Sequence, residues 1–316
     1  MSSTTAPPRA EPPPPAAPRG PGRRPRAGRP DRSVLGLMLP ALVPVVLFSV
    51  APLVYGVYLA FTDARSGRNV DVAFVGPRNF ADLLSDGDFW ASFQIGLVWA
   101  VSVTVLQLAA GMGLALLLNQ DLRLRWLART LAMVPWAMPP VIVGLMWRLV
   151  YHPDAGILNA TLRDIGLVSG DIDWLNDFSV ALPAIIVVGV WTGMPQTTIV
   201  LLAGLQGVPR ELREAAEVDG AGAWRRFRSV TLPQLRPVIT TITSLNFVWN
   251  MNEFALVWVL TQGGPGGRTR LPMLYAYEEA FRYGFFGYAA AMGVAIVAVV
   301  LTVLAVYLRR QLKEMR

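Results

Sequence analysis

Six long apolar windows dominate the pattern of hydrophobic and polar positions along the chain. They cover residues 33–62, 91–120, 130–147, 178–209, 237–267 and 283–308, and Glu253 is the one charged residue that interrupts any of them. Runs of about 18 or more apolar residues with few charges are typical of transmembrane helices. Six such runs cannot all be buried in one water-soluble core. The pattern therefore predicts an all-α integral membrane protein with six transmembrane helices.

The composition of the 316 residues removes several classes of function. Only 16% of the residues are charged, against about 25% in ordinary soluble domains. The chain has no cysteine and one histidine, His152, so we expect no disulfide, no thiol nucleophile and no Cys- or His-based metal site. Its one lysine, Lys313, lies near the C-terminus and no phosphate-binding loop of the Gly-rich type occurs, so the chain is not expected to bind ATP.

The distribution of arginine and lysine predicts the orientation in the membrane. If each window is one crossing, twenty of the 28 basic residues fall in the N-terminal tail, the loops 119–129 and 207–236 and the C-terminus, whereas seven fall in loops on the other side. Loops rich in Arg and Lys stay in the cytoplasm, so both termini are expected there. Topology thus explains the net charge of +7, and no nucleic-acid partner is expected.

The chain divides by composition into a tail and a membrane domain. Residues 1–32 hold ten prolines and seven arginines, a composition that predicts a disordered cytoplasmic tail. Residues 33–316 are expected to form one transmembrane domain. Proline and glycine recur inside its apolar windows, which favours a channel or transporter over a simple anchor. A second interpretation stays open, because proline is commoner in membrane helices generally.

A polar loop at 208–233 separates the fourth and fifth windows. Pro209 suits the first position of a helix, and Asp219–Gly220 has the chemistry of a turn that ends one. A second short helix is expected over 221–228, and Pro233 then begins the return to the membrane. We call this pair of helices the knob. Its small apolar face consists of Leu212, Ala215 and Ala216. Such a face suits docking into a groove of another protein, although a basic loop that only fixes topology is the alternative.

Polar side chains inside the fourth and fifth windows mark candidate functional positions, because they are costly in a membrane. On a helix, Asn246, Asn250 and Glu253 share one face. The fourth window carries a second stripe, consisting of Gly189, Gly193, Gln196 and Thr197. Amides and a carboxylate bond sugar hydroxyls, and an indole such as that of Trp249 covers the apolar side of a sugar ring. Gly193 before Pro195 is expected to break the helix. Alternatively, the polar groups only link neighbouring helices.

Three motifs carry a resemblance to a known family. Glu214-Ala215-Ala216 with Asp219-Gly220-Ala221 resembles the EAA loop of ATP-binding-cassette (ABC) importer permeases, and 261–265 (Thr-Gln-Gly-Gly-Pro) resembles the signature of the carbohydrate-uptake branch, which serves maltose and glycerol-3-phosphate. The resemblance covers residues 34–316 and implies the six-helix, type I (MetI-like) architecture. In that family the loop is a coupling helix seated in a cleft of the cytoplasmic ATPase. The resemblance carries this role to Glu214, Ala215, Ala216, Asp219 and Gly220, with Gly220 giving the bend.

The same resemblance implies a substrate site and partners. It places sugar-contacting positions at Gly189, Thr192, Gly193, Gln196, Asn246 and Asn250, to which the stripe in the fifth window adds Glu253. It also implies a second membrane permease subunit, a cytoplasmic ATPase dimer that binds ATP and Mg, and an extracytoplasmic sugar-binding protein. The chain itself would carry no cofactor and would lie in a bacterial cell membrane.

The sequence therefore predicts a non-catalytic permease subunit that imports a sugar, of di- or oligosaccharide size, by alternating access. Two alternatives stay open for the transport reaction. One is an importer of a phosphorylated polyol such as glycerol-3-phosphate. The other is an ion-driven secondary carrier, although that class typically shows internal repeats and intramembrane acids in both halves. A membrane-embedded enzyme finds no support, since the chain has no Cys, no His pair and no cluster of acids in its windows.

Overall fold

The computed structural model describes residues 40, 42–67, 71–121 and 123–314. The predicted tail at 1–32 lies outside these residues, as does the beginning of the first apolar window. The chain divides into two compact units, residues 1–53 and 54–316. Every described side chain of the first unit is exposed. This suits an apolar helix that is surrounded by lipid.

The described residues are mostly helical, with one isolated antiparallel bridge between Thr62 and Phe74. The helices are η1 (Val46–Val50), α2 (Ala51–Leu59), α3 (Arg78–Ser85), α4 (Gly87–Leu118), α5 (Arg125–Ala137), α6 (Pro140–Val150), α7 (Ile157–Asp164), α8 (Ala181–Gln206), α9 (Arg210–Val218), α10 (Ala223–Arg226), η2 (Phe227–Thr231), α11 (Leu232–Met251), α12 (Ala255–Leu260), α13 (Pro272–Tyr277), η3 (Glu278–Arg282) and α14 (Phe286–Glu314). The all-α class predicted from the apolar windows is confirmed for the described residues.

Within the part of the chain that the structure describes, four helices are long and apolar enough to cross a membrane. They are Leu42–Leu59, Gly87–Leu118, Ala181–Gln206 and Phe286–Gln311. The third window is not one straight helix, because α5 and α6 meet at an angle of 95°. Pro139 and Pro140 lie at this bend and have no N–H groups to continue a helical hydrogen-bond ladder. The described residues therefore hold four clear spans, or five if the bent pair counts as one.

The fifth window is also divided, into α11 and the short α12. Residues 252–254 separate the two helices, and Phe254 has a non-helical backbone with φ −135° and ψ −54°. The prediction of one continuous span over 237–267 was therefore wrong. The break comes at the end of the polar stripe that carries Asn246 and Asn250. It gives Glu253 a place on irregular backbone, which membranes tolerate where it is buried in protein or lines a cavity.

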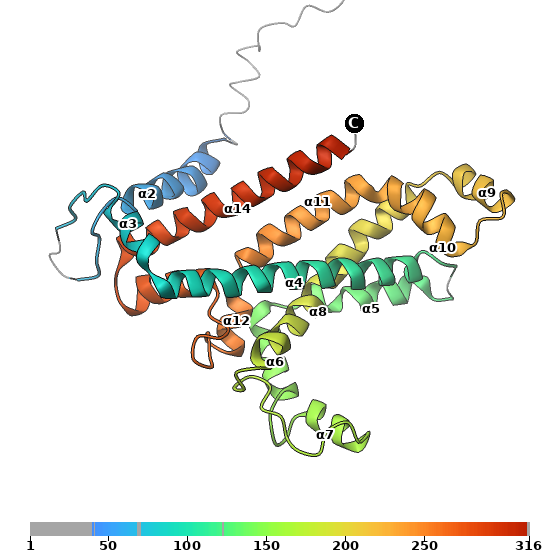
Figure 1. Ribbon diagram of the computed structural model, residues 1–316, viewed down its shortest axis with the longest axis horizontal. Helices are drawn as coiled ribbons and strands as arrows, with labels where there is room; N and C mark the ends of the chain where they lie inside the picture. The colour runs from blue at the N-terminus through green and yellow to red at the C-terminus, as the bar shows by residue number, and fades with distance from the viewer. Residues whose placement is uncertain (1–39, 41, 68–70, 122, 315–316) are drawn as a thin grey trace, which may run out of the picture. The chain divides into compact units, whose positions relative to one another are not determined.

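The second unit is built around the long pair α4 and α8, with α11 packed against both (Figure 1). Two buried clusters hold these helices together. The larger includes Trp99, Ile185 and Leu274, and joins α4 and α8 to α12 and α13. The smaller includes Leu201 and Leu235, near the connections that lead from α4 to α5 and from α8 to α9. The polar cavity described below lies where α4, α8 and α11 meet.

Candidate functional site

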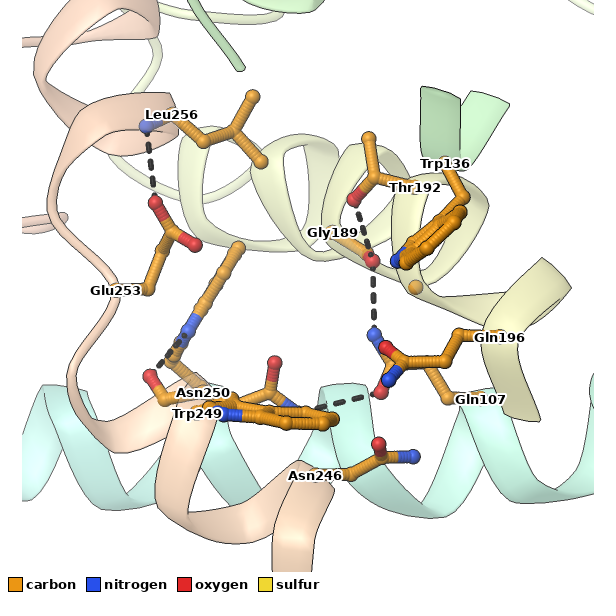
Figure 2. A pocket seen from close by; sticks show the side chains of 12 residues that line it. Gln107, Trp136, Gly189, Thr192, Gln196, Asn246, Trp249, Asn250, Glu253 and Leu256 are labelled. Atoms are coloured by element: carbon orange, nitrogen blue, oxygen red, sulfur yellow. Dashed lines mark hydrogen bonds between the residues drawn. The ribbon is translucent and has the colours of Figure 1, made fainter. Parts of the chain in front are cut away.

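A cavity of about 380 Å³ opens among α4, α5, α8, α11 and α12 (Figure 2). Its lining consists of Trp99, Gln107, Trp136, Gly189, Thr192, Gly193, Gln196, Asn246, Trp249, Asn250, Glu253 and Leu256. All seven substrate positions predicted from the sequence are among these residues. The volume falls within the range of about 300–1,000 Å³ that small-molecule sites occupy. The fold thus brings two stripes that lie some fifty residues apart in sequence to one space.

The α8 wall of the cavity is shaped by glycine. A Cβ atom on Gly189 would lie 2.6 Å from the ring of Trp99, and one on Gly193 would overlap the amide of Gln107. These glycines therefore allow α4 and α8 to approach closely, as small residues do between membrane helices. The predicted helix break before Pro195 was wrong, because α8 runs unbroken from Ala181 to Gln206. Proline removes one backbone donor here without stopping the helix.

Some polar groups of the α8 wall already have hydrogen-bond partners in the protein, and others do not. The Gln107 amide of α4 donates to the Gly189 carbonyl at 3.0 Å, and the Thr192 hydroxyl donates to the same carbonyl at 2.9 Å. The Gln196 amide makes no hydrogen bond to any described part of the protein, and its side chain lines the cavity. An amide that is free both to donate and to accept is suited to a polyhydroxylated ligand.

The α11 wall combines lining positions with links between helices. The Asn246 amide donates to the Thr197 hydroxyl on α8 at 2.8 Å. The Asn250 amide donates to the Thr104 hydroxyl and the Gln107 carbonyl oxygen on α4, at 2.9 and 3.3 Å. Both interpretations of this stripe therefore have structural support, since the asparagines contact neighbouring helices and also border the cavity. Their role as sugar ligands stays a prediction.

Glu253 lies between α11 and α12 and borders the cavity. One of its carboxylate oxygens, Oε1, accepts from the backbone N–H groups of Phe254 and Leu256, at 3.1 and 3.0 Å. The first N–H groups of a helix have no partner within it, so this oxygen supplies the cap for α12. The second carboxylate oxygen is not used by these bonds. Glu253 therefore both fixes the break and offers an acceptor to the cavity.

Four lining residues were not identified from the sequence: Trp99, Gln107, Trp136 and Leu256. Gln107 had a usable signal, because an amide deep inside an apolar window is costly. Trp136 lies just before the bend between α5 and α6, and only the tertiary structure brings it beside α8. The rings of Trp136 and Trp249 are about half exposed, at 54% and 48%. They provide the broad apolar faces on which sugar rings stack.

The knob places the five predicted coupling residues around one sharp bend. Glu214, Ala215 and Ala216 lie on α9, Asp219 caps its C-terminus, and Gly220 follows with a left-handed φ of +76°. The N–H of Gly220 donates to the Glu217 carbonyl and that of Ala221 to the Ala216 carbonyl, at 3.0 and 2.9 Å. This pair of bonds is a Schellman motif, which normally requires glycine at the left-handed position. The predicted bend at Gly220 is present.

The second half of the knob differs from the prediction. The helix that begins at Ala223 does not end near residue 228, because α10, η2 and α11 follow one another with helical backbone at each junction. Pro233 lies in the first turn of α11, where its missing N–H costs little. The second half of the knob is therefore the N-terminal end of one continuous helical segment, the helical rod Ala223–Met251, which also carries Asn246 and Asn250. Glu217 on α9 is joined to Arg226 on this rod by an ion pair of 3.1 Å.

Comparison with known proteins identifies the family. Residues 107–314 match the family described as "Binding-protein-dependent transport system inner membrane component". The chain belongs to this family. A probable ABC transporter permease protein of Brucella suis is 33% identical over 86% of this chain and 94% of its own length. The chain is thus an ABC importer permease, a non-catalytic transport component, and it resides in the membrane.

Further relatives of the permease carry more specific names. The trehalose/maltose transport system permease protein MalF of Thermococcus litoralis is 34% identical, over 86% of this chain and 91% of that protein. The sulfoquinovosyl glycerol transport system permease protein SmoG of Agrobacterium fabrum is 33% identical, over 88% and 90%. A bacterial ABC transporter involved in the import of the acidic polysaccharide alginate has the same fold, with a TM-score of 0.77 over 90% of this chain and 97% of that one, at 21% identity.

A polar cluster at the start of α4 joins this helix to α13 and α14 by hydrogen bonds. The Asp86 carboxylate accepts from the hydroxyls of Tyr275 and Tyr288, at 3.0 and 2.6 Å, and from the backbone N–H of Phe89 at 3.0 Å. Partial burial opposes ionisation of this carboxyl, but the hydrogen bonds outweigh burial and hold the pKa of Asp86 below its usual range. Arg270 extends the cluster through an ion pair with Asp88 at 3.3 Å.

Polar side chains also hold two loops of the permease in place, one of them formed by the 261–265 motif and the residues that follow it. The Asn79 amide donates to the carbonyls of Ala60 and Thr62, at 2.9 and 2.8 Å. Within the 261–271 loop, the hydroxyls of Thr261 and Thr269 are 2.6 Å apart. A buried amide that bonds two carbonyls fixes the path of a loop, because leaving those groups unpaired is expensive. These segments therefore hold the permease's loops and do not border the cavity.

Proposed function

We propose that this permease carries a sugar across a bacterial cell membrane, through the cavity between α4, α8 and α11, in an ATP-driven importer. The observation that carries the proposal is the lining of that cavity. It combines uncharged amides, a hydroxyl and a carboxylate oxygen with two half-exposed indoles. Polar groups of this kind bond hydroxyls, while aromatic faces cover apolar C–H surface. The relatives named for trehalose, maltose and sulfoquinovosyl glycerol agree with a carbohydrate substrate.

We further propose six crossings, with both termini in the cytoplasm. The crossings are the helix Leu42–Leu59, α4, the bent pair α5 and α6, α8, α11 with α12, and α14. Helix α11 has 20 residues, which at about 1.5 Å of rise each spans about 30 Å, the thickness of the hydrocarbon core. The excess of arginine in the loops 119–129 and 207–236 favours a cytoplasmic position for the knob.

The proposal requires partner chains. We propose that the knob docks into a cytoplasmic ATPase, two copies of which bind ATP and Mg, and that a second membrane permease subunit completes the pathway. An extracytoplasmic binding protein would deliver the sugar. The knob is suited to docking because it keeps apolar side chains in contact with solvent, with Val218 87% and Trp224 71% exposed. Leu212 of the predicted apolar face is exposed as well, at 43%, so the knob presents several apolar side chains that a partner groove would cover.

The helical rod from Ala223 to Met251 suggests how energy reaches the cavity. A movement of the ATPase would displace the knob, and the ion pair between Glu217 and Arg226 would transmit the displacement to the rod. Tilting of this rod would move Asn246 and Asn250 relative to α8 and α4. Breaking and remaking their hydrogen bonds would then accompany the switch between outward and inward access, as in a rigid-body rocking mechanism.

The test is uptake by the complete transporter with its genuine partner chains in liposomes loaded with ATP. Glu214→Ala and Gly220→Pro should abolish sugar uptake and co-purification of the ATPase while the permease still inserts. Proline cannot adopt the φ of +76° found at Gly220. Gly222→Ala is the matched control, because a Cβ atom there meets nothing within 4 Å. Uptake that continues without ATPase and follows an ion gradient would refute the proposal in favour of a secondary carrier.

A further inference from the structure

The cavity has a pronounced charge asymmetry. Of the twelve residues that line it, Glu253 alone is ionisable near neutral pH, and none of these lining residues is an arginine, lysine or histidine. The other polar groups are amides, one hydroxyl, backbone carbonyls and indoles. The cavity therefore offers hydrogen-bond donors and acceptors in quantity but, in the described part of the chain, no positive charge to balance an anion.

None of the arginines on the helices around the cavity is among its lining residues. Arg236 precedes Asn250 by fourteen positions on α11, which is about 21 Å of helical rise. Arg129 on α5 donates to the Leu118 carbonyl at the far end of α4, at 3.4 Å. Leu118 itself lies eleven residues beyond Gln107, about 16 Å along that helix. Neither guanidinium is among the groups that line the cavity.

This arrangement discriminates against a negatively charged ligand whatever the ionisation of Glu253. An anion that leaves water must recover its hydration energy from an opposite charge or from directed N–H donors, and otherwise the penalty is several kcal/mol. The amides of Gln107, Asn246 and Asn250 already donate to groups of the protein. If Glu253 is ionised, repulsion adds to the penalty. If it is protonated, the cavity still holds no cation. A neutral sugar escapes the penalty, because its hydroxyls donate to and accept from groups such as Gln196.

We infer that the cavity takes an uncharged sugar or polyol and excludes anionic ones because its lining holds no cation, and that the Glu253 carboxylate strengthens this selectivity. The inference rests on the proposed function, namely that this cavity holds the transported sugar. It argues against a phosphorylated polyol such as glycerol-3-phosphate as the substrate. Neither the fold nor the family decides the matter. The same fold occurs in a transporter of the acidic polysaccharide alginate, and the relative SmoG is named for sulfoquinovosyl glycerol, whose sulfonate is an anion.

The inference is tested by binding to the detergent-solubilised, nucleotide-free membrane complex without its binding protein, so that the cavity alone discriminates. The probes are radiolabelled pairs that differ mainly in charge: trehalose with trehalose 6-phosphate, glucose with glucuronate, and glycerol with glycerol 3-phosphate. We expect at least one neutral probe to bind at least about a hundredfold more tightly than its anionic counterpart. Comparable affinity within every pair, tighter binding of an anionic member, or no binding of any probe would overturn the inference.

Two variants locate the selectivity. Glu253→Gln keeps the shape of the side chain and one acceptor oxygen for α12 but removes the negative charge. The gap, meaning the ratio of the affinities for the neutral and the anionic member of a probe pair, should therefore narrow about tenfold. Asn252→Ala is the control, since the Asn252 amide bonds the Val248 carbonyl at 2.7 Å and does not line the cavity. It should leave the gap unchanged. An unaltered gap in Glu253→Gln would contradict the role assigned to Glu253.

The inference and the proposed function fail in different experiments. ATP-driven uptake of an anionic sugar at the rate of its neutral counterpart would overturn the inference and leave the importer intact. Absence of any ATP-driven sugar uptake by the complete transporter would remove the proposed function, and the inference with it.

Discussion

Replacing Asn250 with alanine separates its two possible roles, as a sugar ligand and as a link between helices. The Asn250 amide joins α11 to α4 through the Thr104 hydroxyl and the Gln107 carbonyl oxygen, at 2.9 and 3.3 Å. The same side chain borders the cavity. Thr104, by contrast, is buried and does not line the cavity. Thr104→Val therefore removes a link between helices without removing a candidate sugar contact.

The expected magnitudes follow from these contacts. Hydrogen bonds between membrane helices contribute about 0.6 kcal/mol each on average, so the loss of two destabilises the Asn250→Ala permease by about 1 kcal/mol. Loss of a sugar contact makes the free energy of sugar binding less favourable by about 0.5–1.5 kcal/mol. At about 1.4 kcal/mol per tenfold, the KM for uptake should rise roughly two- to tenfold. Thr104→Val should lose about 0.6 kcal/mol of stability and keep its KM.

The assay combines sugar uptake and sugar-stimulated ATP hydrolysis in liposomes with thermal unfolding of the detergent-solubilised complex. Co-purification of the partner chains provides the control for assembly. If Asn250→Ala and Thr104→Val raise KM equally, Asn250 acts only as a link between helices. An unchanged KM in Asn250→Ala would likewise show that the stripe on α11 is structural.

Two further predictions concern the helix pair and the outer cluster. Gly193→Val should destabilise the permease by about 1–3 kcal/mol in thermal unfolding, because the new Cβ atom would overlap Gln107. Gly113→Ala is the control and should not destabilise the permease, since a Cβ atom at this position of α4 meets nothing within 4 Å. Equal losses of stability in the two variants would refute the packing argument. The second prediction concerns Asp86, whose pKa is lowered in the folded protein. Its ionised carboxylate stabilises the fold fully at pH values above the pKa of an aspartate in the unfolded chain, about 3.9. This stabilisation is lost as the pH falls through the lower pKa of the folded state. Between about pH 6 and pH 3, the melting temperature of the Asp86→Asn variant should therefore fall by less than that of the parent permease. An equal fall in the two proteins would contradict this.

The bend of the knob was predictable because its signals are local. Gly220 adopts a backbone conformation that other residues avoid, and the hydrogen bonds that close the turn lie within six residues. The continuation of α10 into α11 was not predicted, because Pro233 was interpreted as the start of a new helix. Proline in a first turn is compatible with either outcome. The choice depends on how the preceding turns pack, which is not a local property.

The residues of the cavity were predicted better than its geometry. Polar groups in a membrane helix are costly, so Asn246, Asn250 and Glu253 stood out against the apolar background. Gln107 carried the same signal. The role of Gly193 was misjudged, because a glycine two positions before a proline suggests a break, whereas this one provides space for Gln107. A close approach between two helices depends on the partner surface and leaves no pattern in either helix alone.

The sequence by itself determined that the chain is an all-α membrane protein, where its apolar segments lie, where the knob bends and which polar residues interrupt the fourth and fifth segments. These properties depend on hydrophobicity and on backbone preferences over a few residues, which neighbours in the chain set. Only the tertiary structure decided that α5 and α6 meet at 95°, that α11 ends before Glu253, and that Trp136 and Gln107 complete the cavity. Those features depend on contacts between helices that are distant in sequence, and packing in three dimensions selects them.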